Sequence, residues 1–383
     1  MKKITNKKSN ELKLIYLSSF LMGLAEGMIA IFVPIYLYKI GYSVHAIIYF
    51  YILASFYFVI FSFWGAKLVS KIGIKYSILL STIFLISYYL LLNYIDKVNI
   101  LFFILPLLMS FKMMCYNYGY HLNFVLNSDK NRRGRELSFI GIINTIVASL
   151  GPFIAGVIIV TLGFEFLFGL GVVILIIGAL FLLISKWDYM PQKIELNNLF
   201  KYFKSKQNWR NFISFSGYAV ESSINRQIWP IYLIILLASS DKLGLVISLS
   251  MLISIIVFYI SGSLTDRYNK NKILLFLTGL HFLAWPLRLA VNSATTVVAV
   301  DSYKNIMEKF LRIPWQAVSY SIGEKQKIYL FIVSRELMFN LARVIVMPLL
   351  VLVFYIDFYP FIISFIIAAG FSLLFPALSK CEK

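Results

Sequence analysis

The sequence predicts an all-α membrane protein with twelve transmembrane helices in two pseudosymmetric six-helix bundles. The chain has 383 residues, of which 60% are hydrophobic and only 14% charged, and a soluble fold of this size cannot bury so much apolar side chain. Apolar runs long enough to cross a bilayer recur along the whole chain. Short motifs also recur at an offset of roughly half the chain, which indicates two copies of one structural unit.

The apolar runs are expected to be helices, because the alternating ten-residue segments of a membrane barrel are absent from the sequence. Most loops between the runs are short, so neighbouring helices should be antiparallel. In chain order, the expected spans are residues 13–37, 46–66, 76–95, 100–124, 138–161, 164–185, 211–237, 243–264, 272–292, 294–318, 328–356 and 358–378.

The longest polar stretch, 186–210, contains Pro191 and six basic residues. We expect it to be a cytoplasmic linker between an N-terminal six-helix bundle, residues 1–185, and a C-terminal one, residues 211–383. Part of the linker predicts a short amphipathic helix on the membrane surface. That helix covers about residues 195–207, with Leu199, Phe200 and Phe203 facing lipid.

The net charge of +19 could suggest a nucleic-acid partner, but its distribution argues against one. The predicted loops and termini on one side hold 25 basic residues, whereas the opposite side holds only Lys39, Lys97 and Lys242. This is the positive-inside pattern of a multi-pass protein. It predicts a cell-membrane protein whose N- and C-termini are both cytoplasmic.

Three kinds of repeat support the two-bundle architecture. The segment 34–37 (Pro-Ile-Tyr-Leu) returns at 230–233, and Glu26 and Glu221 precede the two copies. Arg135-Glu136-Leu137 returns as Arg335-Glu336-Leu337, and a basic turn at 66–75 returns at 262–271. All the offsets lie between 195 and 200 residues. In a membrane protein, such a duplication is typical of a secondary transporter.

The segment 262–272, Gly-Ser-Leu-Thr-Asp-Arg-Tyr-Asn-Lys-Asn-Lys, resembles the cytoplasmic loop signature of the major facilitator superfamily. The matching turn at 66–75 keeps the leucine, Lys71, the glycine and a lysine, but has Ala66 and Ser70 in place of the first glycine and the acid. The resemblance implies a gate that closes the cytoplasmic side. The alternative for the turns is a basic loop that only orients the chain, and the alternative for the Arg-Glu pairs is ordinary helix-end charges. The gate candidates are Asp266, Arg267, Arg135, Glu136, Arg335, Glu336 and Lys71.

Gly151-Pro152 in the fifth span resembles part of the glycine–proline signature of the superfamily's antiporters. The upstream glycines are replaced by Ser138 and Val147, so the match is partial. The alternative interpretation is a structural kink at which helices approach closely.

Ionisable residues at bilayer depth are costly and are therefore candidates for function. The alternative for each is an internal salt bridge, or a base that extends towards the interface, and we expect the latter or simple packing for Lys309 and Arg312. A desolvated carboxylate can carry a proton. The proton-coupling candidates are Glu26, Glu221 and His121, and the cavity candidates are Lys112, Asn117, Asn225, Arg226, Asp301, Lys304 and Glu308.

These observations predict a secondary active transporter that moves a small solute across the cytoplasmic membrane by alternating access, coupled to protons. Drug-like or metabolite efflux is favoured slightly over uptake of a polar solute. A cavity with similar numbers of acids and bases would suit a polar solute, and its five acids are Glu26, Glu221, Asp301, Glu308 and Glu336. A lipid flippase or a non-transporting sensor on the same fold remains an alternative. We expect no enzymatic activity, cofactor, metal or nucleic-acid partner, and a monomer that contacts the solute, protons and the lipid bilayer.

Overall fold

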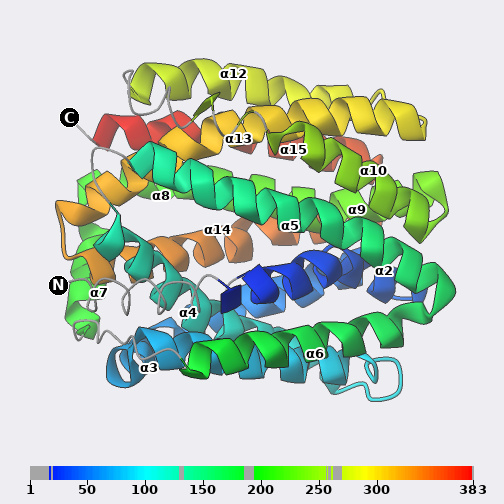
Figure 1. Ribbon diagram of the computed structural model, residues 1–383. Helices are drawn as coiled ribbons and strands as arrows, with labels where there is room; N and C mark the ends of the chain where they lie inside the picture. The colour runs from blue at the N-terminus through cyan, green and yellow to red at the C-terminus, as the bar shows by residue number, and fades with distance from the viewer. Residues whose placement is uncertain are drawn as a thin grey trace, which may run out of the picture.

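The computed structural model describes residues 17–18, 20–128, 133–184, 194–255, 257, 260–261 and 270–381. In these residues the regular secondary structure is helical (Figure 1). Most helices run side by side along one direction, and a short helix, α7 (Leu196–Lys204), lies at one end near the C-terminal segment. We call this the α7 end, and we call the opposite end, which holds α2 (Phe32–Lys39), the α2 end.

The helices before the predicted linker begin with a candidate span, Phe20–Lys39, that includes a turn at residues 30–31 and then α2. The next helix, α3 (Val44–Leu92), contains two predicted spans, 46–66 and 76–95. Three further helices follow, namely α4 (Leu101–Asn127), α5 (Arg133–Thr161) and α6 (Gly163–Ile184).

Beyond α7, the seventh predicted span consists of α8 (Lys206–Ser223), the π-helix η1 (Ile224–Ile228) and α9 (Trp229–Leu237). The later helices overlap the predicted spans, although the first of them ends at Ile253, well before the predicted end at 264. They are α10 (Ser240–Ile253), α12 (Lys270–Arg288), α13 (Ala294–Glu324), α14 (Ile328–Ile356), α15 (Pro360–Ser372) and the 3-10 helix η2 (Phe375–Cys381).

Among the described residues, seven helices are long and apolar enough to cross a membrane. One of them, α3, contains two of the predicted spans. The helices α8 and α13 are not among the seven, and both carry several of the charged residues described below. The count of twelve spans, and the division into two bundles around residues 186–210, stay predictions. The seven are Phe20–Lys39, Val44–Leu92, Leu101–Leu126, Arg135–Thr161, Gly163–Ile184, Ile328–Ile356 and Pro360–Leu378.

The turn expected at 66–75 is shorter than the sequence suggested. The backbone is helical on both sides of Gly73, which alone has non-helical torsion angles (φ 83°, ψ 169°). Glycine reaches positive φ without the steric cost that a side chain imposes, so one residue suffices to redirect the chain. Lys71 is exposed in the helical part just before this break.

The first helix of each predicted half is interrupted at an equivalent place. The helix after Glu26 breaks into a turn at residues 30–31, and the helix after Glu221 becomes the π-helix η1. A proline follows each break, Pro34 in α2 and Pro230 in α9. Proline lacks an N–H and its ring crowds the carbonyl four residues earlier, which explains both irregularities. Interrupted helices at corresponding places are a recurring feature of membrane proteins built from internal repeats.

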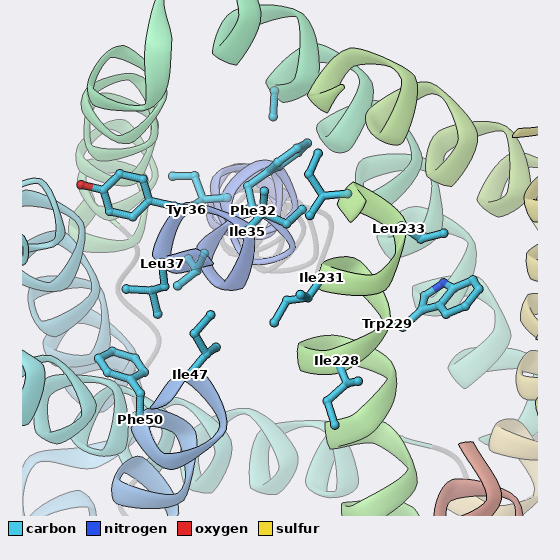
Figure 2. Packing of buried hydrophobic residues seen from close by; sticks show 14 of the residues in the cluster. Phe32, Ile35, Tyr36, Leu37, Ile47, Phe50, Ile228, Trp229, Ile231 and Leu233 are labelled. Carbon is cyan, nitrogen blue, oxygen red and sulfur yellow. The ribbon is translucent and has the colours of Figure 1, made fainter. Parts of the chain in front are cut away.

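The two predicted halves contact each other at both ends of the molecule. Along their length, α3 packs against α14 and α5 packs against α10. At the α2 end, Lys39 Nζ donates a hydrogen bond to Ser240 Oγ at 3.0 Å. Figure 2 shows the fully buried Phe32 of α2 and Ile231 of α9 in one apolar cluster. At the α7 end, the Tyr329 hydroxyl on α14 donates to the carbonyl of Ala66 on α3 at 2.8 Å.

Helix α7 confirms the predicted helix within the linker, but its apolar side does not face lipid as expected. Leu199 and Tyr202 are buried, with 4% and 7% of their surface exposed, in a cluster that includes residues of α8 and α14. Phe203 is partly buried against the same cluster. The helix therefore uses this side to pack on the protein, because the ends of α8 and α14 offer apolar surface there.

Gly151 allows α5 to approach the first helix closely. A Cβ at this position would lie 2.8 Å from the carbonyl carbon of Gly27 and 2.9 Å from the nitrogen of Met28, both backbone atoms. Backbone cannot move aside as a flexible side chain can. The Gly151-Pro152 pair thus has a packing role in this structure, in agreement with the structural interpretation of the motif.

We expect Gly151→Ala to lower the free energy of unfolding by about 1–3 kcal/mol through overpacking. Gly169 in α6 is the matched control, because a Cβ there would meet nothing within 4 Å and Gly→Ala in a helix is neutral or stabilising. Thermal unfolding of the two variants in detergent would measure the difference. Equal midpoints for the two variants would show that the close approach is not required.

Candidate functional site

The first site element is an ion pair between the first helix and α4. Lys112 Nζ lies 2.5 Å from Glu26 Oε1, so the structure brings these two predicted residues together. The Glu26 side chain is 43% exposed although it lies within a spanning helix, whereas that of Lys112 is only 11% exposed. Lys112 Nζ also lies 5.2 Å from the centre of the Tyr116 ring. The ammonium group therefore has an aromatic neighbour besides the carboxylate.

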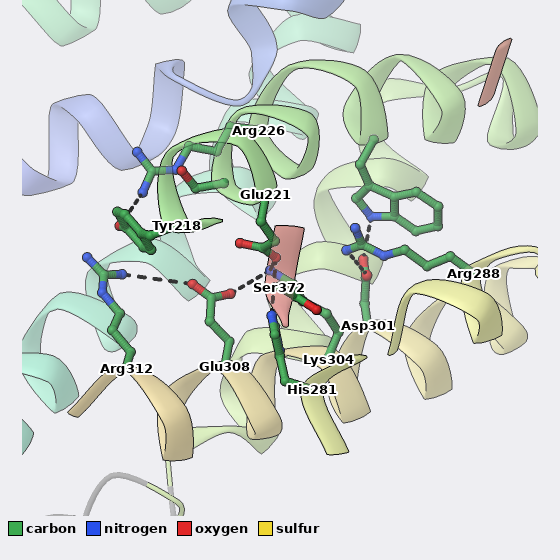
Figure 3. Close-up of polar contacts among 12 residues, drawn as sticks. Tyr218, Glu221, Arg226, His281, Arg288, Asp301, Lys304, Glu308, Arg312 and Ser372 are labelled. Atoms are coloured by element: carbon green, nitrogen blue, oxygen red, sulfur yellow. Dashed lines mark hydrogen bonds and ion pairs between the residues drawn. The ribbon is translucent and has the colours of Figure 1, made fainter. Parts of the chain in front are cut away.

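The second element, around Glu221 on α8, is a buried charge network. Lys304 Nζ on α13 lies 3.6 Å from Glu221 Oε1 and 2.6 Å from Glu308 Oε2. His281 on α12 approaches the same Glu221 oxygen at 3.3 Å. The side chains of Glu221, Lys304 and His281 are at most 2% exposed. Lys304 therefore bridges two carboxylates inside the protein (Figure 3).

Asp301 belongs to a separate pair. Its carboxylate lies 2.8 Å from Arg288 Nη2 and accepts a hydrogen bond from Trp229 Nε1 at 2.9 Å. Arg288 stacks over the rings of Trp229 and Trp285, at 4.0 and 4.6 Å from their centres. Asp301 and Arg288 are 5% and 1% exposed. This is a buried ion pair, so Asp301 does not face accessible space in this conformation.

Basic side chains lie beside the network around Glu221. Arg226 of η1 is exposed and donates to the Tyr218 hydroxyl at 3.4 Å. Arg312 of α13 lies 3.9 Å from Glu308 and 5.8 Å from the centre of the Tyr218 ring. Arg343 of α14 donates to Ser223 Oγ and to Asn340 Oδ1, each at 3.1 Å. The predicted cavity residue Asn225 is partly buried, and its Oδ1 has no hydrogen-bond partner among the described residues.

A further polar cluster joins α4 to α13 and α14. Asn117 Nδ2 donates to Glu336 Oε2 at 2.9 Å. His121 Nδ1 lies 2.7 Å from the Tyr320 hydroxyl, and its Nε2 lies 3.8 Å from Glu336. Arg335 pairs with the adjacent Glu336 at 2.9 Å. Glu336 therefore connects residues on both sides of the predicted linker.

The remaining gate candidates are placed as follows. Asp266 and Arg267 lie outside the described residues. Arg135 is exposed and Glu136 is half-buried in the first turns of α5. Glu336 contacts Asn117 and His121, two residues that the sequence had assigned to the cavity and to proton coupling.

We expect Tyr329→Phe to loosen the α7 end by removing the hydrogen bond to Ala66. A net hydrogen bond contributes about 1 kcal/mol, so conformations open at that end should become about 5-fold more populated. Alkylation of Tyr120→Cys in a background without the two native cysteines (Cys115→Ser, Cys381→Ser), with a membrane-impermeant maleimide, measures this opening. Tyr355→Phe is the control, because Tyr355 lies at the α2 end, where its ring contacts His45. Equal alkylation rates in the two variants would show that this bond does not hold the halves together.

Four residues that lie beside these candidates were not assigned to the site from the sequence. Arg312 was expected near an interface or in packing, but α13 continues to Glu324, which places Arg312 well inside the helix. His281 was given no role. Tyr218 could not be distinguished from the many other tyrosines of the chain. The signal for Arg343 was present, since it is an arginine in the middle of an apolar run.

Comparison with known proteins agrees with this architecture. The family model of the Major Facilitator Superfamily matches residues 15–284. The crystal structure of the human organic anion transporter MFSD10 (TETRAN) superposes with a TM-score of 0.69 at 13% sequence identity, covering 97% of this chain and 99% of that one. At this identity the likeness concerns the fold. No curated protein sequence matches the chain. The chain belongs to the major facilitator superfamily, whose members are multi-pass membrane proteins that transport solutes.

Proposed function

We propose that this protein is a proton-coupled secondary transporter that moves a small solute by alternating access between its two halves. The observation that carries the proposal is the equivalence of Glu26 and Glu221. Each carboxylate precedes a break in the first helix of its half, and each lies within 4.0 Å of a lysine from a neighbouring helix. Ion pairs beside paired helix breaks are the expected features of a midplane transport site.

Glu26 is the better proton carrier of the two. Its side chain is 43% exposed, whereas that of Glu221 is 2% exposed, so protons can reach Glu26 without disruption of the core. A proton on Glu26 would remove the charge that holds Lys112, whose ammonium group could then turn towards Tyr116. Proton binding and solute binding would thus both act on Lys112.

The contacts between the halves provide the moving parts. The α7 end has the Tyr329 hydrogen bond and the cluster around Glu336, and the α2 end has the Lys39–Ser240 bond and the apolar packing of α2 on α9. Alternating access requires that one set breaks while the other holds. The positive-inside pattern makes the α7 end cytoplasmic in this proposal.

A ligand screen tests the proposed function. The purified chain in detergent is heated with sugars, amino acids, nucleosides, organic anions, lipids and cationic drugs at two pH values. A ligand that binds only the folded state raises the apparent midpoint, and a proton-coupled site should respond to one soluble solute class with a pH-dependent shift. A response to lipids alone would favour a flippase. Binding without flux in vesicles would favour a sensor.

A further inference from the structure

The mid-span charges of the described helices are not balanced. Each of the five carboxylates lies within 4.0 Å of a base, but the bases number eight, an excess of three. Similar numbers of acids and bases were expected from the sequence, and this count corrects that expectation. The acids are Glu26, Glu221, Asp301, Glu308 and Glu336, and the bases are Lys112, Arg226, Arg288, Lys304, Lys309, Arg312, Arg335 and Arg343.

Two of the arginines have only neutral hydrogen-bond partners in the described part of the chain. Arg226 bonds to the Tyr218 hydroxyl, and Arg343 bonds to Ser223 and Asn340. A guanidinium group at bilayer depth is costly and normally has a carboxylate partner or a functional role. Ser223, which accepts the bond from Arg343, lies three residues before Arg226 in the chain, so the two like charges lie in the same region of the protein.

Arg312 completes the group from a third helix. It lies beside the ring of Tyr218, whose hydroxyl receives the bond from Arg226, and its contact with Glu308 is a loose 3.9 Å. Figure 3 shows Arg226 and Arg312 reaching towards Tyr218 from two different helices. Tyr320, eight residues after Arg312 on α13, contacts His121 of α4. The helix that carries Arg312 therefore borders the other half of the protein.

We infer that Arg226, Arg312 and Arg343 bind the charged group of a small organic anion, such as a carboxylate, sulfonate or phosphonate. Guanidinium groups bind such oxyanions through two parallel hydrogen bonds. Arg226 and Arg312 adjoin Tyr218, and aromatic surface favours an anion with an organic body over an inorganic ion. This inference rests on the proposed function, because it names the substrate class of the same site.

The first test needs no ligand. If Arg226 is an anion-binding residue, Arg226→Gln relieves repulsion with Arg343 when no anion is bound. The midpoint of thermal unfolding at low salt should then stay unchanged or rise. Arg335→Gln is the contrasting variant, because Arg335 is 3% exposed and paired with Glu336, and its loss should lower the midpoint. A midpoint that falls in Arg226→Gln as much as in Arg335→Gln would show a structural arginine and overturn the inference.

The second test measures binding. Benzoate, glutarate and methylphosphonate are compared with chloride at equal ionic strength, with glucose and with choline, as stabilisers of the wild-type protein. We expect at least one organic anion to stabilise it, and Arg226→Gln to weaken that binding by about 30-fold or more. Arg226→Lys should fall between the two. Arg210→Gln, an exposed position near the start of α8, the helix that precedes η1, should bind like the wild type.

The outcomes separate this inference from the proposed function. Stabilisation by glucose or choline with no response to any anion would overturn the anion site and leave transport standing. Anion binding that depends on Arg226, without flux in vesicles, would support the site and contradict transport. Stabilisation by phosphatidylglycerol in mixed micelles, with no response to the soluble anions, would replace the small solute by a lipid headgroup and overturn the inference.

Discussion

Glu26→Gln should abolish uphill transport and leave the protein folded. The substitution keeps the shape of the side chain but removes the group that would bind and release the proton. The Lys112 ammonium, 2.5 Å from Glu26 Oε1, would then lack its carboxylate at every stage of the cycle. We expect accumulation of the solute to fall to the level of empty vesicles, measured with the purified variant in proteoliposomes under an imposed pH gradient.

Exchange of labelled for unlabelled solute distinguishes loss of coupling from loss of the protein. Exchange requires the two halves to move but requires no net proton movement, so Glu26→Gln should retain it. The matched control is Glu165→Gln, an exposed carboxylate in the first turn of α6, which should behave like the wild type in both assays. Full accumulation in Glu26→Gln would contradict the proton-carrier role of this residue.

The second large effect concerns stability. Asp301→Leu should lower the free energy of unfolding by about 3–5 kcal/mol, because it leaves the guanidinium of Arg288 buried without a carboxylate. Arg288 is 1% exposed, so water cannot replace the lost partner. This change is a large share of the roughly 5–15 kcal/mol that stabilises a folded protein. Chemical or thermal unfolding in detergent would measure it.

A double variant tests whether the pair has any role in transport. Asp301→Leu with Arg288→Met removes both charges, and apolar replacement of a buried ion pair is often neutral or stabilising. We therefore expect the double variant to recover stability and to transport normally. Asp96→Leu, at an exposed loop position, controls for the substitution itself. A stable double variant without transport would show that the Asp301–Arg288 pair is needed for transport.

The sequence predicted the helical class because it depends on local patterns. Glu26 and Lys112 were each recognised as candidates, since a charge in an apolar run is visible in the sequence. The pairing of Asp301 with Arg288 was not predicted, because the sequence shows that Asp301 shares a helix with Lys304 and Glu308 but says nothing of the neighbouring helix.

The sequence also does not show which of the bases lack a close carboxylate. Arg312 and Arg343 gain their meaning only from their partners, since Arg343 contacts neutral groups and Arg312 a distant carboxylate. The π-helix at 224–228 could not be predicted either, although Pro230 explains it once observed. The direction of the apolar side of α7 depended on the surface that α8 and α14 present. Such features depend on tertiary contacts rather than on residue type or spacing.

Uphill accumulation in proteoliposomes tests the central claim, proton-coupled alternating access, most directly. The wild-type protein is reconstituted with the solute that stabilises it in the ligand screen, and a pH gradient is imposed in either direction. We predict accumulation above the equilibrium concentration on the side that the gradient favours, and its collapse when a protonophore is added. Movement that stops at equal concentrations, with or without the gradient, would contradict proton coupling, and absence of any flux would contradict transport.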